Sequence, residues 1–187
     1  MNAINTFVNY VSKGFTHVIP MGFDHILFIL TLFFMNKSLR MVVIQCSVFT
    51  IAHSISLALS AANIILPDTT IIEPLIASSI LFTAIQNIVN DRVNKWRIVI
   101  VFLFGLIHGM GFANALKENG IPDDHFVTAL VAFNIGVEIA QIAIVLLAYL
   151  LISKWCSEKT WYKQRIVYPI SACIACIAFY WTIARIF

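Results

Sequence analysis

The chain has 187 residues, of which 60% are hydrophobic and only 11% are charged. Such a composition excludes an ordinary soluble domain and is typical of a polytopic membrane protein in contact with lipid. The formal net charge of +3 does not indicate a nucleic-acid partner, because most lysines and arginines lie in short gaps between apolar runs, where membrane topology explains them. We therefore predict a single integral membrane domain over residues 1–187.

Six apolar runs follow one another along the chain, after a less hydrophobic N-terminal segment. Residues 1–16 are expected to form an amphipathic helix. A helical run of roughly 20 residues crosses about 30 Å of hydrocarbon, so the predicted fold class is all-α, a transmembrane bundle of about six helices. The predicted membrane helices cover residues 18–36, 41–62, 71–90, 98–117, 126–152 and 167–186.

Basic residues orient this bundle. Lys37 and Arg40 lie in the first gap between apolar runs, and further lysines and arginines gather in the third and fifth gaps. Loops rich in Lys and Arg stay on the cytoplasmic side of a membrane. We therefore predict a multi-pass protein of the bacterial inner (cytoplasmic) membrane, with both termini outside.

Ionisable and amide side chains interrupt these apolar runs at one depth. At about 1.5 Å per residue from the predicted outer helix ends, His25, His53 and His108 lie roughly 12 to 14 Å below the outer surface. Asn134 lies at the same level, and Glu138 follows one helical turn deeper. Such groups are costly in a bilayer unless they meet a partner, water or a metal. We expect the helices to gather them in one layer facing the bundle axis.

Imidazole nitrogens and carboxylate oxygens in one layer match the ligands of Zn²⁺, Ni²⁺ or Co²⁺. Pro20 and Gly22 break regular helix after His17, and this break would fold His17 back over the Asp24–His25 pair. The sequence therefore predicts an intramembrane site for a divalent transition metal. Its predicted ligands are His17, Asp24, His25, His53, His108 and Glu138.

Each of these residues also has a plainer interpretation. Asp24 and Glu138 would serve as protonated hydrogen-bond partners between helices, and a lone intramembrane histidine is more often such a partner than a ligand. Their shared depth favours the metal site. Asn134 and Ser54 are expected to support the ligands through hydrogen bonds.

Around these residues the chain resembles the HupE/UreJ family of membrane proteins. The resemblance covers about residues 14–142 and implies a transporter of nickel or cobalt, associated with hydrogenase and urease systems. His17 and the Asp24–His25 pair are also similar to the His-x4-Asp-His signature of broader nickel/cobalt permeases, although the spacing here is longer by two residues. The motifs that carry the resemblance are Gly14-Phe-Thr-His17, Gly22-Phe-Asp24-His25-Ile-Leu-Phe28, Phe49-Thr-Ile-Ala-His53-Ser54, Phe104-Gly-Leu-Ile-His108-Gly-Met-Gly-Phe112 and Phe133-Asn134-Ile-Gly-Val-Glu138.

Three functions stay open on the sequence alone. The first is an inner-membrane nickel/cobalt transporter whose His/carboxylate site opens to the outer face, although the predicted cytoplasmic half holds few ionisable groups to pass the ion onward. The second is an intramembrane zinc-dependent hydrolase of a lipid or membrane-tethered peptide, with Asp24 or Glu138 as general base. The third is a non-catalytic metal-binding or sensory subunit with a membrane-embedded partner.

Overall fold

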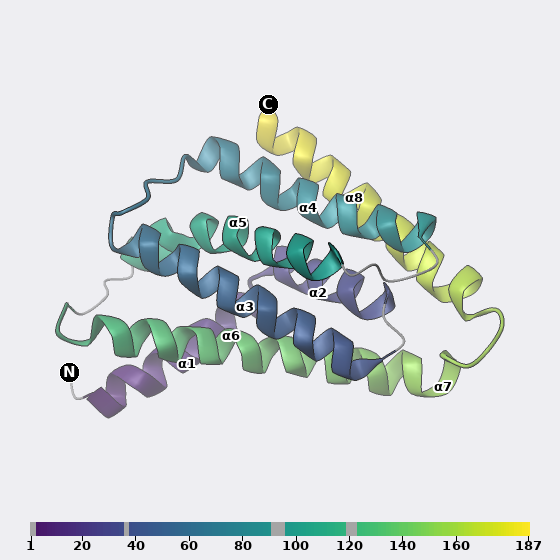
Figure 1. Cartoon of the computed structure of the whole chain (residues 1–187), viewed down its shortest axis with the longest axis horizontal. Helices are drawn as coiled ribbons and strands as arrows, with labels where there is room; N and C mark the ends of the chain where they lie inside the picture. The colour runs from purple at the N-terminus through teal and green to yellow at the C-terminus, as the bar shows by residue number, and fades with distance from the viewer. Residues whose placement is uncertain (1–2, 36–37, 91–95, 119–122) are drawn as a thin grey trace.

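The computed structural model describes residues 3–35, 38–90, 96–118 and 123–187. Within these ranges all regular structure is helical, and the long helices run along the length of the molecule (Figure 1). The elements are α1 (Ala3–Val18), α2 (Phe23–Met35), α3 (Leu39–Ala61), α4 (Thr69–Val89), α5 (Trp96–Glu118), η1 (Asp123–His125), α6 (Phe126–Ala148), η2 (Tyr149–Ser153), α7 (Lys154–Cys156), η3 (Lys163–Val167) and α8 (Tyr168–Ile186).

The predicted all-α class is confirmed. Within the described ranges, four continuous helical segments are long and apolar enough to cross a membrane: Leu39–Ala61, Thr69–Val89, Phe126–Cys156 and Lys163–Ile186. The apolar Trp96–Phe112 part of α5 and the bent pair of α1 and α2 account for the two other predicted spans. The count of about six crossings is therefore consistent with the structure.

The first predicted span, residues 18–36, is not one helix. α1 ends at Val18 and α2 begins at Phe23, and the two helices meet at an angle of 71°. Pro20 explains the break, because its missing N–H and its ring do not fit the interior of a helix. α2 has 13 residues, which makes it about 20 Å long, too short to cross a bilayer alone. The bend therefore places a stretch of irregular backbone between α1 and α2, in which Pro20 and Met21 are exposed and Gly22 is half-buried.

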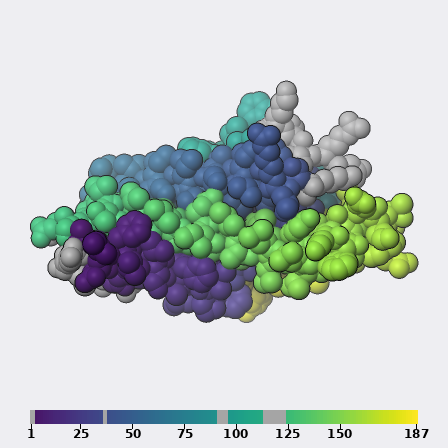
Figure 2. All heavy atoms as spheres, turned by 90° about the horizontal axis from the view of Figure 1, so that it is seen from below, coloured from purple at the N-terminus to yellow at the C-terminus, as the bar shows by residue number. Residues whose placement is uncertain are grey.

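The helices pack mainly in three pairs, α1 with α6, α3 with α5, and α4 with α8. The predicted amphipathic N-terminal helix is confirmed as α1, and its buried stripe repeats every fourth residue at Thr6, Tyr10, Gly14 and Val18. This stripe faces α6, and the two helices lie side by side on the face shown in Figure 2. α1 is thus part of the bundle, and it delivers its last turn to the interior.

Glycines allow α1 and α6 to approach closely. A Cβ on Gly136 would meet the carbonyl oxygen of Val11 and lie 3.0 Å from the Cα of Gly14. We expect Gly136→Ala to lower the free energy of unfolding by about 1–3 kcal/mol, because backbone cannot move aside as a flexible side chain can. Thermal unfolding in detergent measures this. Gly111→Ala is the matched control, since its Cβ would meet the movable Cδ1 of Ile76, and an equal loss in both variants would contradict the prediction.

Candidate metal centre

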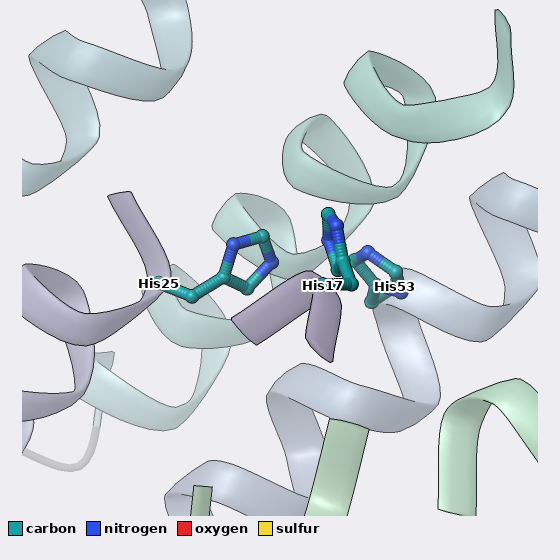
Figure 3. A group of neighbouring side chains, drawn as sticks. All are labelled: His17, His25 and His53. Carbon is teal, nitrogen blue, oxygen red and sulfur yellow. The ribbon is translucent and has the colours of Figure 1, made fainter. Parts of the chain in front are cut away.

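Three histidines from three different helices point their rings at one another in the interior (Figure 3). His17 is in the last turn of α1, His25 in the first turn of α2, and His53 in the middle of α3. One ring nitrogen from each lies within 4.8 Å of the other two. Ring centroids are 4.7 Å apart for His17 and His25, 5.8 Å for His25 and His53, and 6.2 Å for His17 and His53.

The break between α1 and α2 creates this grouping. As predicted, it folds His17 back against His25. Gly22 makes the turn possible, because a Cβ there would meet the carbonyl oxygen of His17 and come within 3.1 Å of the Cα of Val18. The ring of His17 also contacts Phe112, at 3.7 Å between ring centroids. The break therefore brings the imidazole of His17 next to that of His25. A continuous helix through both residues would have kept the two rings farther apart.

A fourth histidine, His108 of α5, lies next to the three-histidine group. Gly105 and Gly109 allow close contact between α5 and α3, because a Cβ on Gly109 would meet the carbonyl oxygen of His53. The His108 ring lies 5.4 Å from that of His25 between centroids. Its Nδ1 is 2.7 Å from the carbonyl oxygen of Phe104. A carbonyl only accepts, so Nδ1 carries the proton and the lone pair of His108 is on Nε2.

His53 is held in the same tautomer. Its Nδ1 lies 3.4 Å from Oδ1 of Asn134, whose Nδ2 donates to the carbonyl oxygen of Leu130 at 2.8 Å. Because the Asn134 amide nitrogen is engaged, the oxygen faces His53 and accepts its Nδ1–H. Asn134 thus contacts a predicted ligand, and its role in supporting metal binding stays a prediction.

All four histidines have a buried Nε2 without a hydrogen-bond partner. A buried polar nitrogen left unpaired is costly, and four such atoms from four helices are not explained by packing. Neutral imidazole nitrogen is a preferred ligand of divalent zinc, nickel and cobalt. The residues therefore fit a transition-metal cation, and the unpaired atoms are those that would bind it. They are Nε2 of His17, His25, His53 and His108.

A cavity of about 720 Å³ leads to this group. Three of the histidines, His17, His25 and His108, line its inner part. Charged side chains from four different helices also line it, and these are Lys13, Asp24, Glu73 and Arg185. The histidine group thus borders a cavity whose lining is mainly apolar but also holds charged groups.

Asp24, a predicted ligand, lies in the cavity wall but binds another group. Both of its carboxylate oxygens accept hydrogen bonds from the Arg185 guanidinium, at 3.1 and 3.2 Å. Arg185 also donates to the carbonyl oxygen of Glu73. The predicted ligand role of Asp24 therefore requires release from Arg185. Sequence reasoning missed this ion pair, whose members are 161 residues apart.

Removing Arg185 should make the centre easier to reach. Arg185→Gln would leave Asp24 as an uncompensated negative charge in the cavity wall. We expect Ni²⁺ association to accelerate by up to about tenfold at low salt, because an anionic cleft attracts cations, and the gain to shrink at high salt. Stopped-flow measurement of metal binding tests this. Arg165→Gln is the control, an exposed arginine of the predicted cytoplasmic side, and an unchanged rate in Arg185→Gln would contradict the prediction.

Glu138, the other predicted carboxylate ligand, lies elsewhere. Its two oxygens accept hydrogen bonds from Ser47 at 2.8 Å and Thr50 at 2.6 Å. It lines a groove between α3 and α6 and not the histidine cavity. Ser54, predicted to support a ligand, donates to the carbonyl oxygen of Thr50 at 2.6 Å. Whether Asp24 and Glu138 bind the metal stays a prediction.

Comparison with known proteins shows the family to which the chain belongs. The family model for HupE / UreJ proteins matches residues 1–185. The chain belongs to the HupE/UreJ family. The match extends beyond residues 14–142, the part that the sequence motifs had covered, to the first turns of α1 and to the elements after residue 142 up to α8. Searches of curated proteins and of solved structures gave no match.

Proposed function

We propose that this HupE/UreJ protein is a permease for a divalent transition-metal cation, Ni²⁺ or Co²⁺, in the bacterial inner membrane. The observation that carries the proposal is the set of four buried imidazole Nε2 atoms without partners. Three of these histidines, His17, His25 and His108, line a cavity that also holds charged side chains. The cavity would open to the outer face, and the histidines would replace the water ligands of the ion as it enters. The metal is the cargo.

The positions of the two carboxylates favour transport over hydrolysis. A metal-dependent hydrolase needs a general base within hydrogen-bond reach of the metal-bound water. Glu138 is engaged by two hydroxyl groups in a separate groove, and Asp24 is engaged by Arg185. Neither carboxylate belongs to the three-histidine group. Histidine ligands without a free base suit a site that binds an ion and releases it.

Uptake into proteoliposomes tests the proposal. The purified chain is reconstituted with a metal-sensitive dye inside the vesicles, and external Ni²⁺ or Co²⁺ is added. We expect saturable uptake that His53→Ala abolishes, because His53 offers one of the three converging nitrogens. A tightly held metal that neither exchanges nor crosses the membrane would contradict transport and favour a structural or sensory role. Turnover of a lipid or peptide substrate that is lost in Glu138→Gln would favour the hydrolase.

A further inference from the structure

A second polar site lies between α3 and α6, on the lateral face of the bundle. The groove has a volume of about 610 Å³. Its wall includes the exposed apolar side chains of Ile51, Val127 and Val131. Its polar lining consists of Ser47, Thr50, Ser54, Asn134 and Glu138. A carboxylate therefore lies in an apolar groove near the middle of two membrane helices.

The Glu138 carboxylate is arranged to carry negative charge. Ser47 and Thr50 each donate a hydroxyl hydrogen bond to one of its oxygens. A carboxylate offers about four lone-pair positions, so further positions face the groove. No cationic side chain in the described part of the chain forms an ion pair with it. A carboxylate in an apolar membrane environment is costly unless a cation or proton compensates it.

The groove and the histidine group are connected by a contact between His53 and Asn134. The groove shares no lining residue with the histidine cavity. Asn134 lines the groove, and its side chain holds His53 of the histidine group. Glu138 follows Asn134 by one helical turn, about 6 Å along α6. The step from the histidines to the groove therefore passes the pair of His53 and Asn134.

The other direction along the bundle is closed to a cation. The rings of Phe28 and Phe49 pack against His108, with ring centroids 5.4 and 5.0 Å away, and both are fully buried. Farther along the bundle, the buried Arg97 of α5 donates a hydrogen bond to the carbonyl oxygen of Thr31 of α2 and places a positive charge there. Apolar packing and a like charge both repel a metal ion. The groove offers the polar neighbourhood that this side lacks.

We propose that Glu138, Ser47 and Thr50 form a second, oxygen-ligated cation site, separate from the histidine centre and next to it on the path of the cargo. The inference rests on the proposed transport function. Oxygen ligands suit hard cations, whereas imidazole suits nickel and cobalt. The second site therefore binds Ni²⁺ more weakly than the histidines do. A tight site followed by a weak one allows the ion to leave.

Equilibrium titration with Ni²⁺ tests this, using the full chain in lipid nanodiscs. Wild type should show a tight binding event and a weak one. Glu138→Gln, which keeps the side-chain volume, should leave the tight event unchanged and weaken the other by at least about tenfold. Thr50→Val, which removes one hydroxyl donor, should weaken the same event. Glu73→Gln, a carboxylate at the cavity wall, is the matched control and should keep the weak event.

Two results would overturn the second site. One is an unchanged weak event in Glu138→Gln, and the other is loss of the tight event, which would make Glu138 a ligand of the histidine metal. Adding Na⁺ and Mg²⁺ as competitors distinguishes a site for the cargo from one for a coupling ion, and displacement of Ni²⁺ by sub-millimolar Na⁺ would contradict a cargo site. If wild type showed no tight binding of Ni²⁺, the result would contradict the proposed function instead. The second site would then still be tested by comparing the weak binding event in wild type and in Glu138→Gln.

Discussion

His25→Ala should reduce the affinity of the purified protein for Ni²⁺ by at least about 100-fold, the upper range for loss of a residue that merely supports a ligand. His25 is central to the group, with its ring within 5.8 Å of those of His17, His53 and His108 between centroids. The imidazoles of His17, His53 and His108 cannot move into the position left by His25, because they are fixed on α1, α3 and α5. Isothermal titration in detergent or nanodiscs measures the loss.

Two comparisons make the His25 result specific. His125→Ala removes a histidine of η1 that lies outside the group and should leave the affinity unchanged. The metal-free His25→Ala protein should also stay folded, since the substitution removes a buried nitrogen that has no partner. Equal affinity of His25→Ala and wild type for Ni²⁺ would contradict a metal site at this position.

Asn134→Ala should weaken Ni²⁺ binding by about 10–100-fold without removing any ligand. Asn134 fixes the proton of His53 on Nδ1, which leaves Nε2 free for the metal. Without this acceptor, the ring can turn or take the other tautomer, and the binding geometry is lost for part of the population. The change in affinity is measured by the same titration.

A conservative variant separates positioning from packing at Asn134. Asn134→Asp restores an oxygen acceptor toward His53 and should recover most of the affinity, whereas a packing defect would persist. Ser54→Ala is the control from the same groove, because the Ser54 hydroxyl donates to the Thr50 carbonyl and not to a histidine. An effect of Ser54→Ala as large as that of Asn134→Ala would show that the groove as a whole, and not the His53 contact, matters.

Much of the histidine group could be predicted from local sequence signals. Pro20 and Gly22 indicated the break that returns His17 to His25. These signals act over one or two helical turns, where steric rules are strong. Depth along the helices then predicted that imidazoles from different helices would meet.

The carboxylates could not be placed in the same way. Depth put Asp24 and Glu138 near the histidines, but the direction in which each side chain points depends on how neighbouring helices rotate. Arg185 reaches Asp24 from α8, and Ser47 and Thr50 of α3 hold Glu138 in the groove between α3 and α6. Such pairings join residues 88 to 161 positions apart. No periodicity within one helix indicates them.

X-ray absorption at the nickel edge of the Ni²⁺-loaded protein shows whether imidazole nitrogens from several helices bind one transition-metal ion, because imidazole rings give a characteristic scattering pattern beyond the nearest atoms. We expect three or four imidazole ligands, in line with the converging His17, His25 and His53 and the adjacent His108, and loss of this pattern in His25→Ala. A spectrum with only oxygen or sulfur ligands, or one that His25→Ala leaves unchanged, would contradict binding by these imidazoles.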